Sequence, residues 1–282
     1  MLYRSLIGAA ALTAALCLGQ AQAFDDAMYP DWKGQWRRIS PPGQPAFDPS
    51  KPRGRGQQIP FTEEYQAVFE ANLKDLAAGG EGLWPGYRCR PPGMPPMMTA
   101  YEPLEIIILP ETTYIRIDHI HDTHRRIYTD GRDWPEEAEP AYVGYSIGKW
   151  IDADGDGRYD LLEIETRHIK GPRAYDAMGA PLHRDDKTVV KERIYLDNAD
   201  PNVLRDEITV IDNALTRPWT VTKSYRRNPD PRPEWQEYIC TENNTHVHLG
   251  KESYFMSGDG YLMPAKKDQP PPDLRYFKRA TK

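Results

Sequence analysis

The chain has 282 residues, with 36 basic and 42 acidic side chains, a formal net charge of −6 and 39% hydrophobic residues. A mildly acidic chain without basic runs is a poor candidate for binding nucleic acid or an anionic membrane surface. Its 27 prolines and 21 glycines are fewer than a low-complexity disordered chain carries. These quantities predict one main folded domain with proline-rich segments around it.

Residues 1–23 have the features of a secretory signal peptide. Arg4 precedes an apolar run over residues 6–19, and an Ala-Gln-Ala cleavage pattern follows at 21–23. The run is too short to span a hydrocarbon core of about 30 Å; a retained anchor is the alternative interpretation. We therefore expect a periplasmic or secreted protein with no membrane insertion once the signal is removed.

Cysteine usage agrees with export. Cys17 lies in the signal, so the mature chain keeps only Cys89 and Cys240. Two thiols in an oxidising compartment are expected to form a disulfide. Such a bond would close a long loop and restrict the unfolded chain. Two separate buried thiols are the alternative.

Residues 24–100 form a proline- and glycine-rich arm, in which Trp32 and Trp36 are the expected anchors. Within the arm, residues 61–78 predict one helix because apolar side chains recur at helical spacing along a single stripe. Thr62 is the expected N-cap, and acidic residues follow it in the first turn.

Residues 101–263 consist of short runs of β-branched and aromatic residues, some separated by turn pairs such as Asp130-Gly131. Many runs alternate apolar and polar positions, which is typical of half-buried strands. The pattern predicts a mainly β domain, an antiparallel barrel or sandwich. Residues 264–282 are expected to form an extended tail.

The strongest motif is the segment 152–163, which matches the calcium-loop pattern D-x-[DN]-x-[DN]-G-x₅-E. Calcium takes about six to eight hard oxygen ligands, and carboxylates at alternate positions can converge on one ion. The candidate ligands are Asp152, Asp154, Asp156, the Arg158 carbonyl, Asp160 and Glu163.

The flanks of this loop look like strands, whereas an EF-hand needs a helix on each side. We therefore predict a structural calcium loop, 152–163, in a hairpin. In that setting Asp160 is a safer ligand than Glu163. An acidic, solvated turn is the alternative interpretation.

Histidines gather in residues 118–132. His119 and His121 would share a face if the segment were one strand, and His246 and His248 repeat the spacing. Polar residues on a solvated hairpin, a transition-metal site and an acid–base role are the three interpretations. The candidates for acid–base chemistry are His119, His121, His124 and Tyr128.

Three arginines in the same region, Arg125, Arg126 and Arg132, could line an anion-binding mouth, because guanidinium groups suit carboxylates and phosphates. The alternative is ion pairing across strands. The acidic partners for such pairs would be Asp130, Glu136 or Glu192.

Six blocks occur in a fixed order: PPGMPPMM (91–98), RRIYTDGRDWP (125–135), GYSIGKW (144–150), VVKERIY (189–195), EITVIDNALTRPWTV (207–221) and EYICTENN (237–244). Together they resemble a widespread, largely uncharacterised family of exported bacterial proteins. The resemblance implies a lipocalin-like (calycin-like) β-barrel with N-terminal wrapping, and no established reaction. The chain departs from the family pattern at Trp134 and Tyr145, where the pattern has histidine.

Three functions remain open at this point. The first is an exported β-barrel protein that has a calcium loop and binds a small organic ligand. The second is an exported enzyme acting on a small organic or sugar-derived substrate by His/Tyr acid–base chemistry. The third is a calcium-stabilised structural envelope protein. Histidine and arginine side chains converging in one pocket would favour the enzyme.

Overall fold

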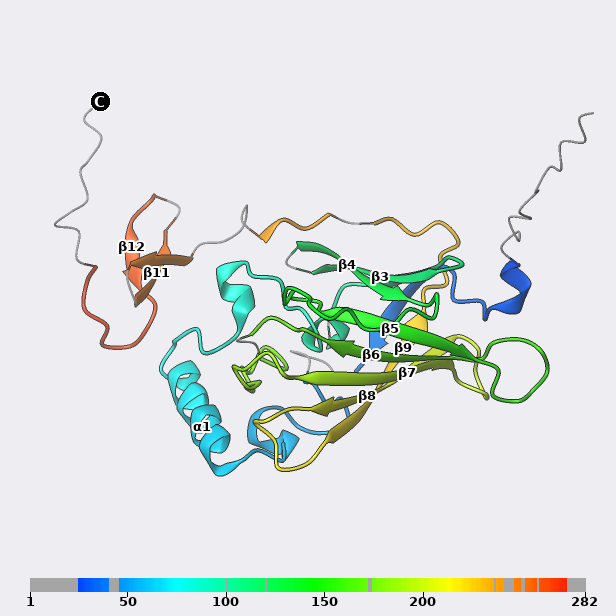
Figure 1. The fold of residues 1–282 in the computed structure, drawn as a ribbon. Coiled ribbons are helices and arrows are strands. Elements are labelled where there is room, and N and C mark those ends of the chain that lie inside the picture. Colours follow the sequence, from blue (N-terminus) through cyan, green and yellow to red (C-terminus); the bar gives the residue numbers. More distant parts are fainter. Residues whose placement is uncertain are drawn as a thin grey trace, which may run out of the picture.

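The computed structural model describes residues 25–40, 46–99, 101–119, 121–171, 174–235, 237–240, 246–249, 252–257 and 259–272. The expected signal peptide lies outside the described residues. The described chain is mainly β, as predicted, with a closed barrel of nine strands and a separate three-stranded sheet (Figure 1).

The barrel strands follow one another in chain order, and β9 pairs back onto β1. They are β1 (Gln35–Ile39), β2 (Leu104–Ile108), β3 (Thr112–His119), β4 (His121–Tyr128), β5 (Tyr145–Ile151), β6 (Leu161–Arg167), β7 (Val189–Leu196), β8 (Val203–Ile211) and β9 (Trp219–Arg227). Neighbouring strands are antiparallel except for β4 and β5, which pair in parallel. The smaller sheet contains β10 (His246–Leu249), β11 (Glu252–Met256) and β12 (Leu262–Pro264).

Strand β1 comes from the segment that the sequence predicts as an extended arm. Trp36 lies opposite Leu104 of β2 and opposite Arg227 of β9. Its ring is fully buried, and its indole N–H donates to the carbonyl of Trp32, 3.0 Å away. The two tryptophans therefore anchor the arm as expected, and the arm also supplies the strand that closes the barrel.

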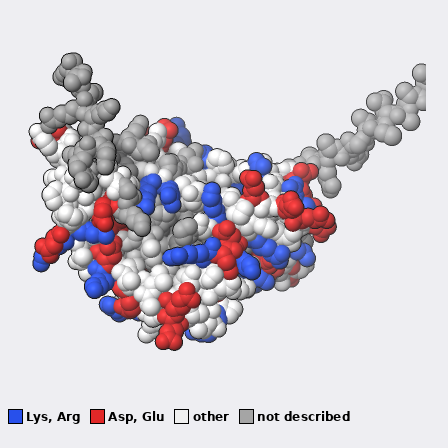
Figure 2. All heavy atoms as spheres, turned by 60° about the vertical axis from the view of Figure 1, so that its left-hand side comes forward, with Lys and Arg blue, Asp and Glu red and all other residues white. Residues whose placement is uncertain are grey.

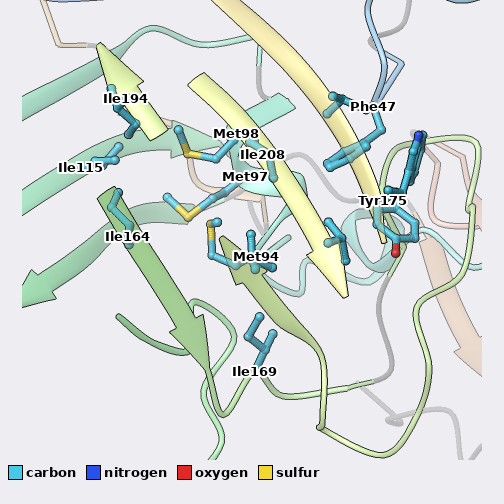
Figure 3. Packing of buried hydrophobic residues seen from close by; sticks show 14 of the residues in the cluster. Phe47, Met94, Met97, Met98, Ile115, Ile164, Ile169, Tyr175, Ile194 and Ile208 are labelled. Atoms are coloured by element: carbon cyan, nitrogen blue, oxygen red, sulfur yellow. The ribbon is translucent and has the colours of Figure 1, made fainter. Parts of the chain in front are cut away.

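The turn-rich segment before β2 fills the barrel interior. Met94, Met97 and Met98 are at most 1% exposed and belong to the same hydrophobic cluster as the inward isoleucines of β3, β6, β7 and β8 (Figure 3). Methionine suits such a position because its flexible side chain adapts to irregular gaps. Gly93 permits this entry, since a Cβ there would lie 2.2 Å from the carbonyl oxygen of Tyr142.

The predicted helix is α1 (Glu63–Ala77), and Thr62 caps it by accepting a hydrogen bond from the backbone N–H of Tyr65 at 3.3 Å. Tyr65 and Phe69 are buried toward the barrel side. Short 3₁₀ turns complete the arm: η1 (Asp26–Met28), η2 (Gly54–Gln57), η3 (Pro85–Arg88) and η4 (Pro96–Thr99). No helix among the described residues is long and apolar enough to cross a membrane.

Cys89 follows η3 directly and pairs with Cys240 in a disulfide, with the two Cα atoms 5.5 Å apart. The bond joins segments 151 residues apart in sequence. It ties the helical arm to the stretch between the barrel and the smaller sheet. The disulfide expected between these two cysteines is therefore present.

The closing strand provides a test of the fold. Trp36→Ala should lower the free energy of unfolding by about 3–5 kcal/mol, because it leaves a large cavity beside the closing strand. Ile39→Ala on the same strand removes a side chain that is 41% exposed and should cost about 1 kcal/mol or less. Urea denaturation of both variants checks the difference, and equal losses would show that β1 closes the barrel by backbone pairing alone.

Candidate functional site

The acidic loop connects β5 to β6, so strands flank it on both sides, as predicted. It projects from the end of the barrel opposite α1 (Figure 1). Each of Asp152, Asp154 and Asp156 has a carboxylate oxygen within 4.8 Å of the others. Three exposed carboxylates at this spacing repel one another in the absence of a cation, and their hard oxygens are the donors that calcium prefers.

Backbone hydrogen bonds hold the loop in its curled form. The Asp152 carboxylate accepts from the N–H groups of Gly155 and Gly157, at 2.7 and 2.9 Å. Gly157 has a φ of +88°, which explains why the motif requires glycine at this turn. At the base, the Asp160 carboxylate accepts from the N–H of Ala153 at 2.8 Å.

Glu163, another predicted ligand, lies outside this group of aspartates, and the Arg158 carbonyl stays a predicted ligand. Glu163 is on β6, where it is exposed and forms an ion pair with Arg193 at 3.6 Å. The Arg158 guanidinium Nε donates to the carbonyl of Ala27 at 3.0 Å. Within the described chain, the metal-competent acidic group therefore contains the three leading aspartates and not Glu163.

The predicted arginine mouth is divided between the two faces of β4. Arg125 points into the barrel and is fully buried, with its guanidinium bonded to Glu192 at 2.9 Å and to Thr166 at 2.7 Å. Its Nε donates to the hydroxyl of Ser146 at 3.1 Å. Arg125 is thus an interior ion pair, which is the alternative interpretation given above.

Further charged groups lie inside the barrel. Asp206 of β8 and Lys223 of β9 are cross-strand neighbours and at most 1% exposed. The Lys223 ammonium donates to the carbonyl of Phe47 at 2.5 Å and to Thr99 Oγ1 at 2.9 Å. Burial lowers the pKa of Lys223 to about 7 and raises the pKa of Asp206 well above its usual value. Sequence reasoning missed this network. Charged residues at the positions of alternating strands that face inward could have indicated it.

Arg126 and Arg132 lie on the outer face. The Arg132 guanidinium stacks 3.7 Å above the Tyr128 ring and bonds the Asp130 carboxylate, with Nε 2.9 Å from Oδ1. These hydrogen bonds lower the pKa of Asp130. Arg126 packs 5.3 Å from the Tyr114 ring. Both guanidinium groups therefore take part in a cation–aromatic surface outside the barrel.

Trp134 and Tyr145 meet on the same outer face. The Trp134 and Tyr145 ring centroids are 6.0 Å apart, and Tyr145 also packs 5.0 Å from Tyr128. Arg167 stacks 4.2 Å over Trp134.

The assumption that His119 and His121 share one strand is wrong. They form a cross-strand pair, with His119 at the end of β3 and His121 at the start of β4. Their side chains lie outside the described residues. His124 is exposed on β4, opposite Arg116. His246 and His248 do share one strand, β10, and both lie beside Glu81.

A groove that sequence reasoning missed lies between α1, the 82–90 segment and the 181–184 loop. It encloses about 510 Å³. Trp84, Tyr65 and His183 contribute aromatic side chains, and the Tyr65 and His183 rings lie 5.1 Å apart. Arg88, Arg90 and Arg184 contribute guanidinium groups, against one acidic lining residue, Glu64.

The charges of the groove are unevenly compensated. Arg88 is 3.5 Å from Glu81. No salt bridge connects Arg90 or Arg184 to an acid in the part of the chain that the structure describes. On the face drawn in Figure 2, basic and acidic side chains are interspersed. In the described part of the chain, the groove therefore presents two arginines without a salt-bridge partner beside aromatic walls.

Comparison with known proteins adds no relative: no family model matches the chain, and no curated protein or solved structure is similar to it at a significant level.

The buried Lys223 gives a pH test. Unfolded lysine keeps its proton up to pH 10.5, whereas Lys223 in the folded protein releases it near pH 7. Because the unfolded state then binds more protons between these values, wild-type stability should rise with pH relative to Lys223→Met, by up to about 1.4 kcal/mol per pH unit. Urea denaturation from pH 6.5 to 10 measures this difference; parallel pH profiles would show that Lys223 stays charged.

Proposed function

We propose that this protein is an exported β-barrel that binds a small organic anion in the groove between α1 and the 82–90 and 181–184 segments. The observation that carries the proposal is that Arg90 and Arg184 line the groove beside Trp84 and form no salt bridge with an acid among the described residues. A volume of about 510 Å³ is in the range of small-molecule sites, which combine apolar walls with a few polar anchors.

The barrel interior supports placing the ligand outside. Buried methionines and the bonded Arg125–Glu192 pair occupy the interior positions where a carrier would keep a cavity. In the groove, Trp84 offers a flat surface to an apolar ring, and the guanidinium groups pair with carboxylate or phosphate oxygens. The ligand class is therefore an aromatic or alicyclic carboxylate or phosphate.

Arg90→Gln and Arg184→Gln should each weaken binding of such an anion about tenfold, because each removes a charge-assisted hydrogen bond. A thermal-shift screen of organic acids, followed by calorimetry on the best ligand, measures the effect. Arg217→Gln is the matched control, since Arg217 is exposed and lies outside the groove. Equal affinity in all three variants would disprove the assignment.

We further propose that the loop at Asp152, Asp154 and Asp156 binds a structural calcium ion. Their converging carboxylates and the curled backbone around them support it. The ion would neutralise their mutual repulsion and fix the β5–β6 hairpin. Asp160 would join them directly or through water.

At saturating calcium, the melting temperature of the wild-type protein should exceed its value in chelator by about 5–10 °C. Asp154→Asn combined with Asp156→Asn should abolish the difference. The control variant combines Glu136→Gln with Glu137→Gln, which removes the same charge from two exposed positions elsewhere. It should keep the calcium-dependent difference in melting temperature. A calcium response that persists in the aspartate variant would place the ion at another site.

The finer fold assignment and the compartment are also proposals. The sequential strand order of the closed barrel supports a lipocalin-like fold. The Cys89–Cys240 pair supports export to an oxidising compartment, as do the signal features of residues 1–23.

One observation favours the enzyme as a second candidate. His183 lines the groove, and its Nδ1 is 2.9 Å from an Asp185 carboxylate oxygen. Such a carboxylate orients an imidazole for proton transfer. The protein would be an enzyme if it converts the bound anion and if His183→Asn abolishes this turnover while leaving binding intact.

A further inference from the structure

A second cleft lies at the start of β1, between residues 101–103 and the 228–235 segment that follows β9. It encloses about 470 Å³ and shares no lining residue with the groove beside α1. Two aromatic side chains, Tyr101 and Trp235, line it. Its other lining groups are two prolines and seven planar polar side chains: two guanidinium groups, three carboxylates and two amides. The cleft is therefore rich in groups that form directional hydrogen bonds.

Gln35 of the closing strand fixes the outer wall of this cleft to the barrel. The Gln35 side chain is buried, and its Nε2 donates to the carbonyl of Glu234 at 2.9 Å and to the carboxylate of Glu105 at 3.0 Å. The backbone carbonyl of Gln35 accepts from the N–H of Asn228 at 2.7 Å. The wall is thus held at both of its ends without a ligand, and a preformed cleft lowers the entropy lost on binding.

The wall itself is stiff. The Asn228 side-chain oxygen accepts from the backbone N–H of Asp230 at 3.2 Å, and the Asp230 carboxylate accepts from the N–H of Arg232 at 2.9 Å. The residue that follows each of these three is proline, which fixes the backbone φ. Successive polar side chains of the wall therefore keep a defined direction.

Guanidinium groups position both aromatic rings of the cleft. Arg116 of β3 lies 4.4 Å from the centroid of the Trp235 ring. Arg38 of β1 lies 5.4 Å from the centroid of the Tyr101 ring, which is nevertheless 45% exposed. Aromatic rings held at the surface of a cleft offer flat apolar area at a small entropic cost.

We propose that this cleft binds a neutral saccharide. Its two basic and three acidic lining residues leave no excess of positive charge, whereas the groove beside α1 has three arginines against one acid. Mixed donors and acceptors suit a ligand whose groups do both, and sugar hydroxyls donate as well as accept.

The shape of the lining groups supports the same ligand class. Planar carboxylate, amide and guanidinium groups can form paired hydrogen bonds with neighbouring hydroxyls of one sugar ring. The C–H groups of such a ring pack on aromatic side chains. A volume of about 470 Å³ lies in the lower half of the range of small-molecule sites, which corresponds to a mono- or disaccharide. The proposal does not depend on an anion binding in the other groove.

Saturation-transfer NMR of the full chain with glucose, galactose, mannose, N-acetylglucosamine and their disaccharides tests the proposal. At least one of these sugars should bind, with a dissociation constant of about 1 mM. Trp235→Ala should weaken this binding about tenfold, and Trp235→Phe, which keeps a ring, should retain most of it. Tyr261→Ala is the matched control, because it removes a ring that is 73% exposed and lies outside the cleft.

Two measurements on the wild-type chain do not require a variant to fold. Crystals soaked in the sugar that binds should show its ring between Trp235 and Tyr101. Glucuronate should bind no more tightly than glucose, since the cleft has no excess of positive charge. Binding of none of these sugars, a sugar seated elsewhere, or a preference for glucuronate would each overturn the proposal.

Discussion

Closure of the barrel by β1 is the constraint on which the rest of the structure depends. Without it, β2 and β9 would present unpaired edges, which favour aggregation. Trp36 secures the strand by burying its ring completely. Closure also determines the interior, because a sealed barrel must satisfy every polar group that it encloses. The Arg125–Glu192 pair and the Lys223 contacts satisfy part of that requirement. The buried Asp206 carboxylate oxygens have no hydrogen-bond partner among the described residues.

Because the barrel interior is filled with side chains, the candidate sites lie outside it. The methionine segment enters the barrel from the arm, and the same arm continues backward into the wall of the groove. The groove beside α1 consequently lies where segments remote in sequence cover the barrel, and the acidic loop projects at the far end. The barrel acts as a rigid support for them.

Local chemistry and the Cys89–Cys240 disulfide were predictable from the sequence, and the other distant pairings were not. The Thr62 cap and the flanking strands of the acidic loop follow from short-range rules, and the structure has both. Strand β1 is hidden in a proline- and glycine-rich context, and only its long-range partners make it a strand. Adjacent Arg125 and Arg126 point to opposite faces because strand side chains alternate. No local pattern links Glu81 to β10.

The order of the strands has a consequence for how the chain folds. The closing contact joins Trp36, which is synthesised early, to Arg227, which is synthesised late. Until β9 has been synthesised, β1 lacks one of its two partners, and the interior methionines lack the wall that covers them. Such long-range pairing is slow, since loop-closure entropy is paid before the contact forms. A chain that stops before β9 is therefore an open sheet with its hydrophobic interior exposed, and the barrel forms only once nearly the whole sequence is present.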